Sequence, residues 1–410
     1  MRIRREREPR VVVTGIGLCT SLGATREASW SAILRGETRC RSVSPGASIA
    51  SGPFFGHPID SNPGGVRRLL VQTAREAIED AELLASGVAP ERVAVVVGLS
   101  KGDVAGLEAF HGPGPRPDWV AHWPHAGATE VAREWDFRGP SLAPVAACAT
   151  GLIAALRGVD LIQRGEADAV LVGAADASLT PLMLGAFARM GALARVNDPT
   201  HPASAVRPWD RRRTGFLVGE GAAVLVLENA EHARARGVRP YCVLAGGAFG
   251  SDAYHITSLD ADPTTLAHVV EHALKRSDIE GRRIDHVNVH GTATRFNDPL
   301  ECQALRRALG PRAVDVTCAA NKPQIGHCLG AAGAVELAIT CLSMRDGVIP
   351  RTLFLEDRDP ACDLDITSDG HRVRLIQTAL KLSLGFGGHL AAAVLQRADD
   401  ARSFTEPIAP

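Results

Sequence analysis

The chain has 410 residues, of which 45% are hydrophobic and 22% charged, with a formal net charge of −1. This balance gives no electrostatic reason to expect binding to nucleic acid or a membrane surface, and no apolar run approaches membrane-spanning length. The nine cysteines are scattered and include no C-x-x-C pair, and the 14 histidines show no metal-binding spacing. The sequence therefore favours a reducing cytoplasm over a disulfide framework, and predicts no metal site. Residues 1–10 mix charges of both signs and are expected to form a solvated tail.

Strands and helices alternate along the rest of the chain. Short runs of β-branched and apolar residues predict strands at 11–17, 93–98, 169–173, 216–227, 243–247, 286–290, 314–319, 382–388 and 391–395. Apolar residues at helical spacing predict helices at 27–34, 66–84, 126–135, 152–163, 230–236, 264–276, 299–309 and 330–344, and partly over 180–193. Residues 36–65 and 111–124, rich in turn-forming residues, are expected to be loops. The alternation predicts an α/β fold with covered sheets, and its repetition predicts two similar halves, residues 10–238 and 240–397.

A cysteine stands between an apolar run and a predicted helix. Residues 145–147 lead directly into Cys148, and residues 152–163 carry the helical pattern. The first N–H groups of a helix lack intrahelical partners and carry partial positive charge, which favours a thiolate there. Cys148 is therefore a candidate nucleophile. The alternative is a small buried apolar residue, as most unpaired cysteines are.

The glycine-rich residues 15–17 raise the possibility of a nucleotide site. The third glycine of a dinucleotide fingerprint is missing, because Thr20 stands in its place, and no phosphate-binding loop motif occurs elsewhere. Dinucleotide binding is therefore disfavoured.

Polar groups follow three predicted strands of the second half. They lie in residues 290–294 (HGTAT), 321–327 (NKPQIGH) and 385–388 (GFGG). The carboxyl ends of strands are where open α/β sheets build their sites. A single histidine is more often a satisfied core or surface residue. Two histidines at strand exits, His290 and His327, with Lys322 nearby, indicate a site instead.

The ordered motifs of this chain resemble those of β-ketoacyl-[acyl carrier protein] synthases, most closely the chain-elongating type II branch. The resemblance runs from about residue 10 to 397 and rests on residues 11–17, 147–151, 207–210, 219–221, 289–294, 322–327 and 385–388. It implies the thiolase-like fold, with duplicated halves in five layers, α-β-α-β-α. It also implies an acyl carrier protein with a phosphopantetheine arm as partner, malonyl and acyl thioesters as substrates, and no cofactor. A dimer is expected, either of two copies or with a related subunit.

The resemblance also implies the chemistry. Cys148 would take an acyl group from a carrier thioester, and His290 and His327 would bind the carbonyl of malonyl carrier protein. Decarboxylation would give an enolate that attacks the acyl-cysteine, releasing carbon dioxide and a 3-oxoacyl carrier protein. Such a reaction serves fatty-acid, polyketide or specialised lipid synthesis.

Further roles are implied for residues around these three. The backbone N–H groups of Cys148 and Phe386 would form the oxyanion hole, and Phe386 would also gate the acyl pocket. Lys322 would be the active-site lysine and Glu336 its ion-pair partner. Contacts to the phosphopantetheine arm fall to Thr292, Thr294 and Gly387.

The chain departs from the family pattern in two places that bear on the substrate. His389-Leu390 follows the last glycine pair where the family usually has Thr-Asn, and residues 36–65 are shorter than usual. Two alternatives therefore stay open. One is a non-catalytic partner subunit similar to chain-length factors, although those usually carry glutamine instead of the cysteine. The other is a thiolase, although residues 385–388 lack the second cysteine that thiolases use.

Overall fold

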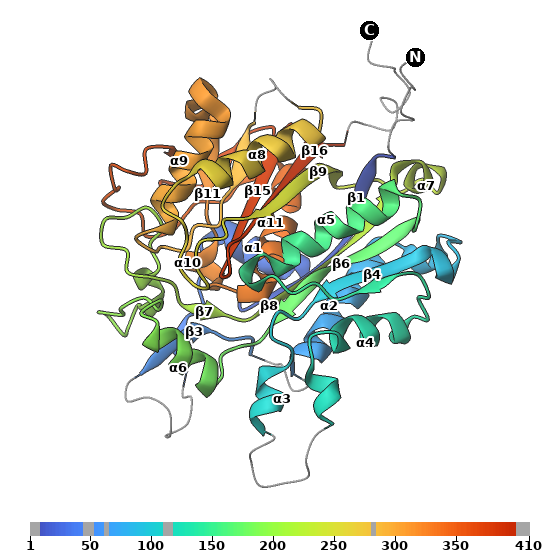
Figure 1. Ribbon diagram of the computed structural model, residues 1–410, viewed down its shortest axis with the longest axis horizontal. Helices are drawn as coiled ribbons and strands as arrows, with labels where there is room; N and C mark the ends of the chain where they lie inside the picture. Colours follow the sequence, from blue (N-terminus) through green and yellow to red (C-terminus); the bar gives the residue numbers. More distant parts are fainter. Residues whose placement is uncertain (1–8, 44–52, 61–64, 110–117, 280–283, 399–410) are drawn as a thin grey trace.

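The computed structural model describes residues 9–43, 53–60, 65–109, 118–279 and 284–398, and residues 1–8 of the tail predicted at 1–10 lie outside them (Figure 1). Eleven strands form one hydrogen-bonded series in the order β13-β11-β10-β15-β16-β9-β1-β8-β6-β4-β5. Its first-half strands are β1 (Val11–Thr20), β4 (Val93–Gly98), β5 (Ser141–Leu142), β6 (Ala169–Asp176) and β8 (Gly221–Asn229). Its second-half strands are β9 (Cys242–Ser251), β10 (His286–Asn288), β11 (Thr317–Ala319), β13 (Asp365–Ile366), β15 (Thr378–Gly385) and β16 (His389–Arg397).

Two small sheets and the helices complete the described chain. One small sheet contains β2 (Arg41–Val43), β3 (Phe54–His57) and β7 (Val218–Gly219), and the other contains β12 (Val348–Ile349) and β14 (Arg372–Val373). The helices are α1 (Arg26–Arg35), α2 (Gly65–Asp80), α3 (Val104–Ala109), α4 (Ala126–Glu134), α5 (Thr150–Gln163), α6 (Pro181–Arg189), α7 (Ala230–Ala235), α8 (Thr264–Arg276), α9 (Asn297–Leu309), α10 (Lys322–Ile325) and α11 (Ala332–Asp346). None of the described helices is long and apolar enough to cross a membrane.

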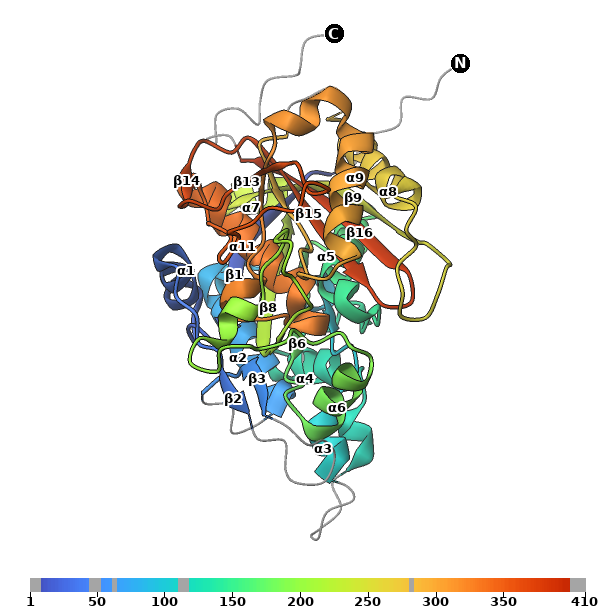
Figure 2. The same ribbon diagram turned by 90° about the vertical axis from the view of Figure 1, so that its left-hand side faces the viewer.

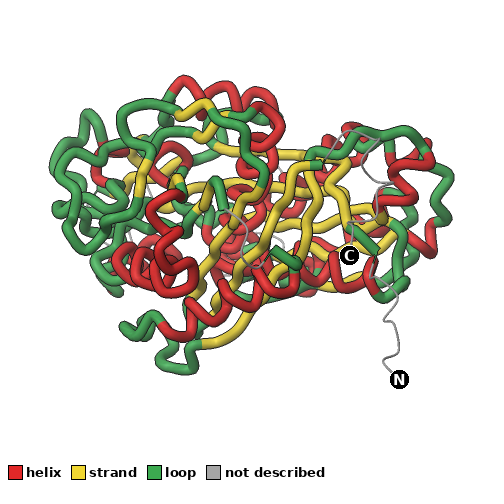
Figure 3. Tube along the Cα trace, turned by 90° about the horizontal axis from the view of Figure 1, so that it is seen from above, coloured by secondary structure: helices red, strands yellow, loops and turns green. Residues whose placement is uncertain are grey.

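The five layers pack together through three apolar cores. The first-half strands pack one face against α2 and α4, and the second-half strands pack one face against α8 and α9. The other faces of both halves meet α5 and α11 in a shared central core. Figure 2 shows α8 and α9 at the top, α2 and α4 below, and α5 and α11 between them, and Figure 3 shows helices flanking the strands. The α-β-α-β-α prediction is confirmed. The boundary near residue 239 stays a prediction.

Composition explains why α11 occupies the central layer. Every residue of α11 from Ala332 to Met344 is buried, and its apolar side chains surround the helix instead of forming one stripe. A helix that is apolar on all sides must be covered on all sides. Strands β4 and β6 are likewise buried along their whole length, as expected for parallel strands with helices on both faces.

The two halves of the sheet join at one short contact. β1 and β9 run antiparallel and pair only at Val12 with Val243 and at Val13 with Cys242. By contrast, β1 pairs with β8 along nearly its whole length. The short β1–β9 contact allows the two halves to face each other across α5 and α11.

The prediction that residues 36–65 form a loop is wrong where β2 and β3 occur. These strands span only three and four residues, too few for the alternation that identifies a strand, and they are held by pairing with each other and with β7. Residues 44–52 and 61–64 lie outside the described residues. In the same way, the strand predicted at 314–319 starts only at Thr317, because residues 310–315 form a short 3-10 helix. The loop predicted at 111–124 contains a 3-10 turn at 119–122, and residues 110–117 are not described.

Candidate active site

Cys148 lies where the sequence predicts it, directly before α5. It sits in the 3-10 turn Ala147–Ala149, which runs into α5 at Thr150. Ala147 has a φ of 46°, in the left-handed region that costs a non-glycine residue about 1–3 kcal/mol. The Thr150 hydroxyl holds this turn by accepting from the Ala146 N–H at 2.9 Å and donating to the Ala147 carbonyl at 2.8 Å. Seven of the nine cysteines are buried, whereas Cys148 and Cys40 keep partial exposure.

The hairpin between β15 and β16 covers the backbone of Cys148. Gly385 approaches so closely that a Cβ there would lie 2.7 Å from the Ala146 carbonyl oxygen and 3.1 Å from the Cys148 nitrogen. Phe386 follows at the start of the turn and packs in the same apolar cluster as Cys148. Gly387 stands exposed at the tip with a φ of 84°. The predicted oxyanion donors, Cys148 and Phe386, therefore lie on two segments in close contact.

We expect Gly385→Ala to separate these two segments. Because the added methyl group meets backbone atoms that cannot rotate away, the substitution should lower the free energy of unfolding by about 1–3 kcal/mol. It should also slow acylation of Cys148. Denaturant unfolding and a rate of thioester consumption check both effects. Gly370→Ala is the matched control, since a Cβ there meets nothing within 4 Å. Equal effects of the two substitutions would contradict the proposed contact.

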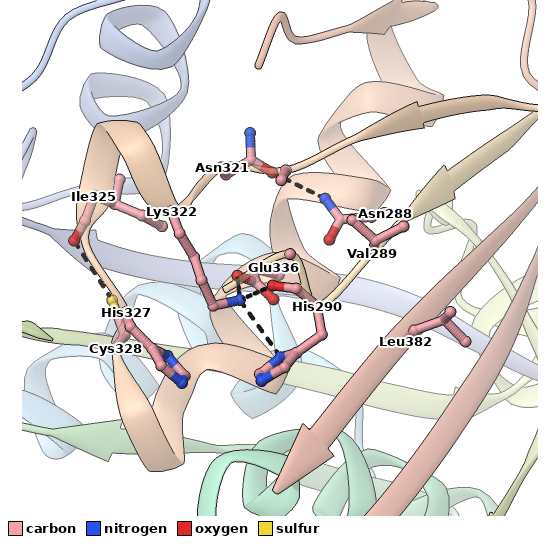
Figure 4. Close-up of polar contacts among 12 residues, drawn as sticks. Asn288, Val289, His290, Asn321, Lys322, Ile325, His327, Cys328, Glu336 and Leu382 are labelled. Carbon is pink, nitrogen blue, oxygen red and sulfur yellow. Dashed lines mark hydrogen bonds and ion pairs between the residues drawn. The ribbon is translucent and has the colours of Figure 1, made fainter. Parts of the chain in front are cut away.

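The structure brings Cys148 together with His290 and His327. The ligand-capable atoms of the three side chains all lie within 4.8 Å of one another. His290 follows β10, and His327 follows α10, so the trio joins segments from both halves of the chain. The two imidazole rings lie 5.2 Å apart between centroids at an interplanar angle of 79°, and Figure 4 shows them side by side.

Hydrogen bonds indicate which ring nitrogen carries the proton. His327 Nδ1 accepts from the Leu329 N–H at 3.2 Å, and His290 Nδ1 lies 3.4 Å from Lys322 Nζ, a donor. In a neutral imidazole the proton is then on Nε2. Burial, reinforced by the charge of Lys322, holds the pKa of both histidines well below the usual value. Both rings are therefore neutral near pH 7, and each offers one Nε2–H donor.

The thiol of Cys148 is protonated at rest. Burial raises its pKa to about 11, although the charges of Lys101 and Lys322 oppose this rise. The prediction of a stabilised thiolate is wrong for the resting site, because desolvation outweighs the nearby positive charges. Acyl transfer therefore requires the thiol to lose its proton, and the positive charges of Lys101 and Lys322 favour that loss.

Lys322 and Glu336 form the predicted ion pair beneath His290. Lys322 Nζ donates to Glu336 Oε1 at 2.6 Å and also to the His290 carbonyl oxygen, and both side chains are buried (Figure 4). The other carboxylate oxygen of Glu336 accepts from Lys381 at 2.6 Å. Lys381 was not identified from the sequence, because in β15 it reads only as a polar residue in an apolar strand.

Glu301 is a second residue that the sequence did not identify. Its two carboxylate oxygens accept from the N–H groups of His290 at 2.6 Å and Gly291 at 2.7 Å. Asn297 donates to the same carboxylate at 2.7 Å. Glu301 lies on α9, one turn after Asn297, and its only sequence signal is an acidic residue on a face that the helix buries. It fixes the backbone that carries His290.

The predicted arm-binding threonines lie next to this backbone. The hydroxyl oxygens of Thr292 and Thr294 are 3.0 Å apart, and Thr294 Oγ1 accepts from the Asn297 N–H at 3.3 Å. Thr292 is buried, whereas Thr294 is partly exposed. Thr294 therefore supports the start of α9, and its contact with a substrate stays a prediction.

An apolar cluster extends from Cys148 and is the candidate binding region for an acyl chain. Its buried members are Leu184, Phe187, Phe216, Val218 and Leu329, and its partly buried members are Val43, Phe54, Cys148, Leu179, Met183, Ala192, Leu193 and Phe386. The small sheet β2-β3-β7 contributes to this cluster. The region predicted to be a loop thus contributes to this apolar cluster.

His327 is tied to the same cluster through its backbone. Its N–H donates to the Leu217 carbonyl at 2.8 Å, and its carbonyl accepts from the Gly219 N–H at 3.0 Å. The Phe216 ring stands edge-on to the His327 ring, with 4.9 Å between centroids. The segment at 216–219, which contributes to the apolar cluster, therefore also positions this histidine.

Sulfur and imidazole nitrogen are also zinc ligands. Among the described side chains, Cys148, His290 and His327 form the group with the spacing to hold a metal ion. A metal bound there would occupy the thiol and both Nε2–H groups. The arrangement is better suited to a nucleophile facing two hydrogen-bond donors.

Comparison with known proteins places this chain in a family. The profile described as "Beta-ketoacyl synthase, N-terminal domain" matches residues 64–233, and "Beta-ketoacyl synthase, C-terminal domain" matches residues 241–356. The chain belongs to the β-ketoacyl synthase family. The family assignment predicted from the motifs is thus confirmed.

Named β-ketoacyl synthases match this family member over almost their whole length. The tetracenomycin polyketide synthase ketoacyl synthase alpha subunit of Streptomyces glaucescens is 37% identical, covering 97% of this chain and 100% of that protein. The 3-oxoacyl-[acyl-carrier-protein] synthase 2 of Coxiella burnetii is 34% identical, covering 95% of this chain and 99% of its own length.

Solved β-ketoacyl synthase structures share the fold. A type II polyketide ketosynthase, solved in complex with its acyl carrier protein and bound to the hexaketide, has a TM-score of 0.90 at 30% identity. The match covers 96% of this chain and 100% of that one. The ishigamide ketosynthase/chain length factor has a TM-score of 0.86 at 29% identity, with the same coverage of both chains.

Proposed function

We propose that this β-ketoacyl synthase joins a cysteine-bound acyl group to malonyl carrier protein, with loss of carbon dioxide. The observation that carries the proposal is the convergence of Cys148 with two neutral histidines, His290 and His327, within 4.8 Å. The products are a 3-oxoacyl carrier protein, longer by two carbons, and carbon dioxide.

In the first half-reaction Cys148 attacks the acyl thioester. The Cys148 thiol gives up its proton as its sulfur forms the new thioester bond, and the departing carrier sulfur takes up a proton. The oxyanion of the tetrahedral intermediate is stabilised by the N–H groups of Cys148 and Phe386. The acyl chain enters the apolar cluster beside Cys148, with Phe386 at its entrance.

In the second half-reaction malonyl carrier protein loses its carboxylate. The carbon–carbon bond to carbon dioxide breaks, and its electron pair forms an enolate. The Nε2–H groups of His290 and His327 donate to the enolate oxygen, where negative charge develops. The enolate carbon attacks the acyl-cysteine, and the Cys148 sulfur leaves and regains a proton. The Lys322–Glu336 pair orients the His290 backbone.

Carrier binding and assembly follow the same proposal. Thr292, Thr294 and Gly387 line the approach of the phosphopantetheine arm. β5 is one of the two edge strands of the main sheet, and its Leu142 and the nearby Val145 are 41% and 54% exposed. This edge suits a subunit interface, either with a second copy or with a related subunit.

The pathway is fatty-acid, polyketide or specialised lipid synthesis.

The nine unpaired cysteines suit the reducing cytoplasm, which we propose as the place of action.

Acyl transfer to the thiol is the direct test. After incubation with an acyl carrier thioester, intact-mass spectrometry should show one acyl group per chain on Cys148. Cys40→Ser is the matched control, because Cys40 is the other partly exposed cysteine, and its loss should leave the adduct unchanged. An unmodified Cys148 would contradict the proposal and favour a non-catalytic partner subunit.

A further inference from the structure

Lysine is rare in this chain and concentrated at the site. Of the 45 lysine and arginine residues, only Lys101, Lys275, Lys322 and Lys381 are lysines. Lys322 and Lys381 meet at Glu336, and Lys101 is close enough to lower the pKa of Cys148. Lys275 is exposed on α8. Lysine differs from arginine because it loses its proton when it is buried unfavourably, whereas arginine stays charged.

Two of these lysines share a single carboxylate in the core. Lys322 and Lys381 each donate to a different oxygen of Glu336 at 2.6 Å, and all three side chains are at most 2% exposed. Lys381 also donates to the carbonyls of Val289 and Leu382, so it holds the residue before His290. With both lysines protonated, the cluster carries one positive charge more than the carboxylate balances.

We infer that Lys381 is a positioning residue of the decarboxylation site, whose proton supplies the excess positive charge beneath His290. This inference rests on the proposed function. The charge acts through the Glu336–Lys322–His290 chain of contacts and stabilises the enolate as negative charge forms. Since Lys381 is fully buried and its polar contacts are Glu336 and the carbonyls of Val289 and Leu382, its effect falls on the decarboxylation half-reaction.

The groups around Lys381 allow its side chain to lose a proton near pH 8. Burial, opposed by Glu336, lowers the pKa of Lys381 to about 8. The charged or titratable groups that face it or feel its charge are Glu336 on α11, Lys322 on α10, Glu301 on α9, His286 on β10, His290 and His327. Burial lowers the pKa of all three histidines, so they stay neutral as Lys381 titrates. Below pH 8 the excess charge is present, and above pH 8 it is lost.

The test compares the two half-reactions across pH in the full chain. Wild-type decarboxylation of malonyl carrier protein should fall as pH rises through about 8. In Lys381→Met the decarboxylation rate at pH 7 should be about tenfold lower than in the wild type. The decline in rate near pH 8 should be absent. At every pH value, the rate of Cys148 acylation in Lys381→Met should stay within about twofold of the wild-type rate. Lys275→Met is the matched control and should reproduce the wild-type profile.

A purely structural role would slow both half-reactions in parallel and leave the decline near pH 8 in place, which would overturn the inference. If Lys381→Met does not fold, lysine-selective ¹³Cε labelling of the wild-type chain gives a second measurement. Four signals are expected, and the inference is rejected unless a buried one titrates near pH 8. Wild-type protein that performs neither half-reaction would overturn the proposed function itself. Normal half-reactions with an unchanged Lys381→Met profile would overturn only the inference.

Discussion

Replacing Cys148 by alanine should abolish condensation, with a loss of at least about 10³-fold, because the variant has no atom to carry the acyl group. The same variant should still decarboxylate malonyl carrier protein, since the donors of that step are His290 and His327. Acetyl carrier protein should therefore accumulate where the wild type makes a 3-oxoacyl product. Separation of carrier species by mass spectrometry measures both outcomes in one reaction.

The fold should tolerate this change, because Cys148 is partly exposed and the turn is held by Thr150. A Cys148→Ala protein with a wild-type unfolding curve and full condensation would disprove the nucleophile role. A second replacement, Cys148→Ser, keeps the hydrogen-bonding group but is a much poorer nucleophile near neutral pH. Its activity should also stay far below wild type.

Removing either imidazole should slow decarboxylation but still allow acylation of Cys148, which is the reverse of the result expected for Cys148→Ala. His290→Ala and His327→Ala should each lower decarboxylation about 10²–10³-fold, the usual cost of losing one donor to a developing oxyanion. The acyl adduct on Cys148 should still form. Initial rates of carbon dioxide release and adduct formation separate these effects.

The chemical identity of the histidines gives a sharper control. Asparagine can donate a hydrogen bond from its amide but cannot act as a base near pH 7. His290→Asn and His327→Asn should therefore retain more decarboxylation than the alanine variants. If asparagine and alanine are equally inactive, hydrogen-bond donation is not the main role of that histidine. Since both imidazoles stay neutral, the wild-type rate should show no inflection near pH 6.5.

Much of the architecture could be predicted because it is encoded locally. The helix at 264–276 and the segment after Cys148 show their periodicity directly, and the strand at 93–98 is a continuous apolar run. His290, His327 and Cys148 lie at the ends of such elements, so their convergence could be predicted once the motifs were read together.

The residues that were missed depend on contacts far apart in sequence. Glu301 holds the His290 backbone, and Lys381 reaches Glu336 across 45 positions of the chain. In the hydropathy pattern, a buried charged residue appears only as one polar position among apolar ones. The strands β2 and β3 were missed because pairing, not composition, makes them strands. The pKa of Cys148 was misjudged because the sequence shows the helix start but not the depth of burial.

The backbone pairing of His327 with residues 217–219 has a consequence for altering this protein. Because the segment at 216–219 both contributes to the proposed acyl-binding cluster and holds the backbone of His327, the proposed enolate-binding imidazole, changes in chain-length preference should also change the catalytic rate. Trimming Phe216 to admit a bulkier acyl chain would also remove the ring that braces His327. Selection for a new product length in this scaffold should therefore favour changes on α6 or at residues 43 and 54, which would make room for the acyl chain without disturbing the backbone that holds His327.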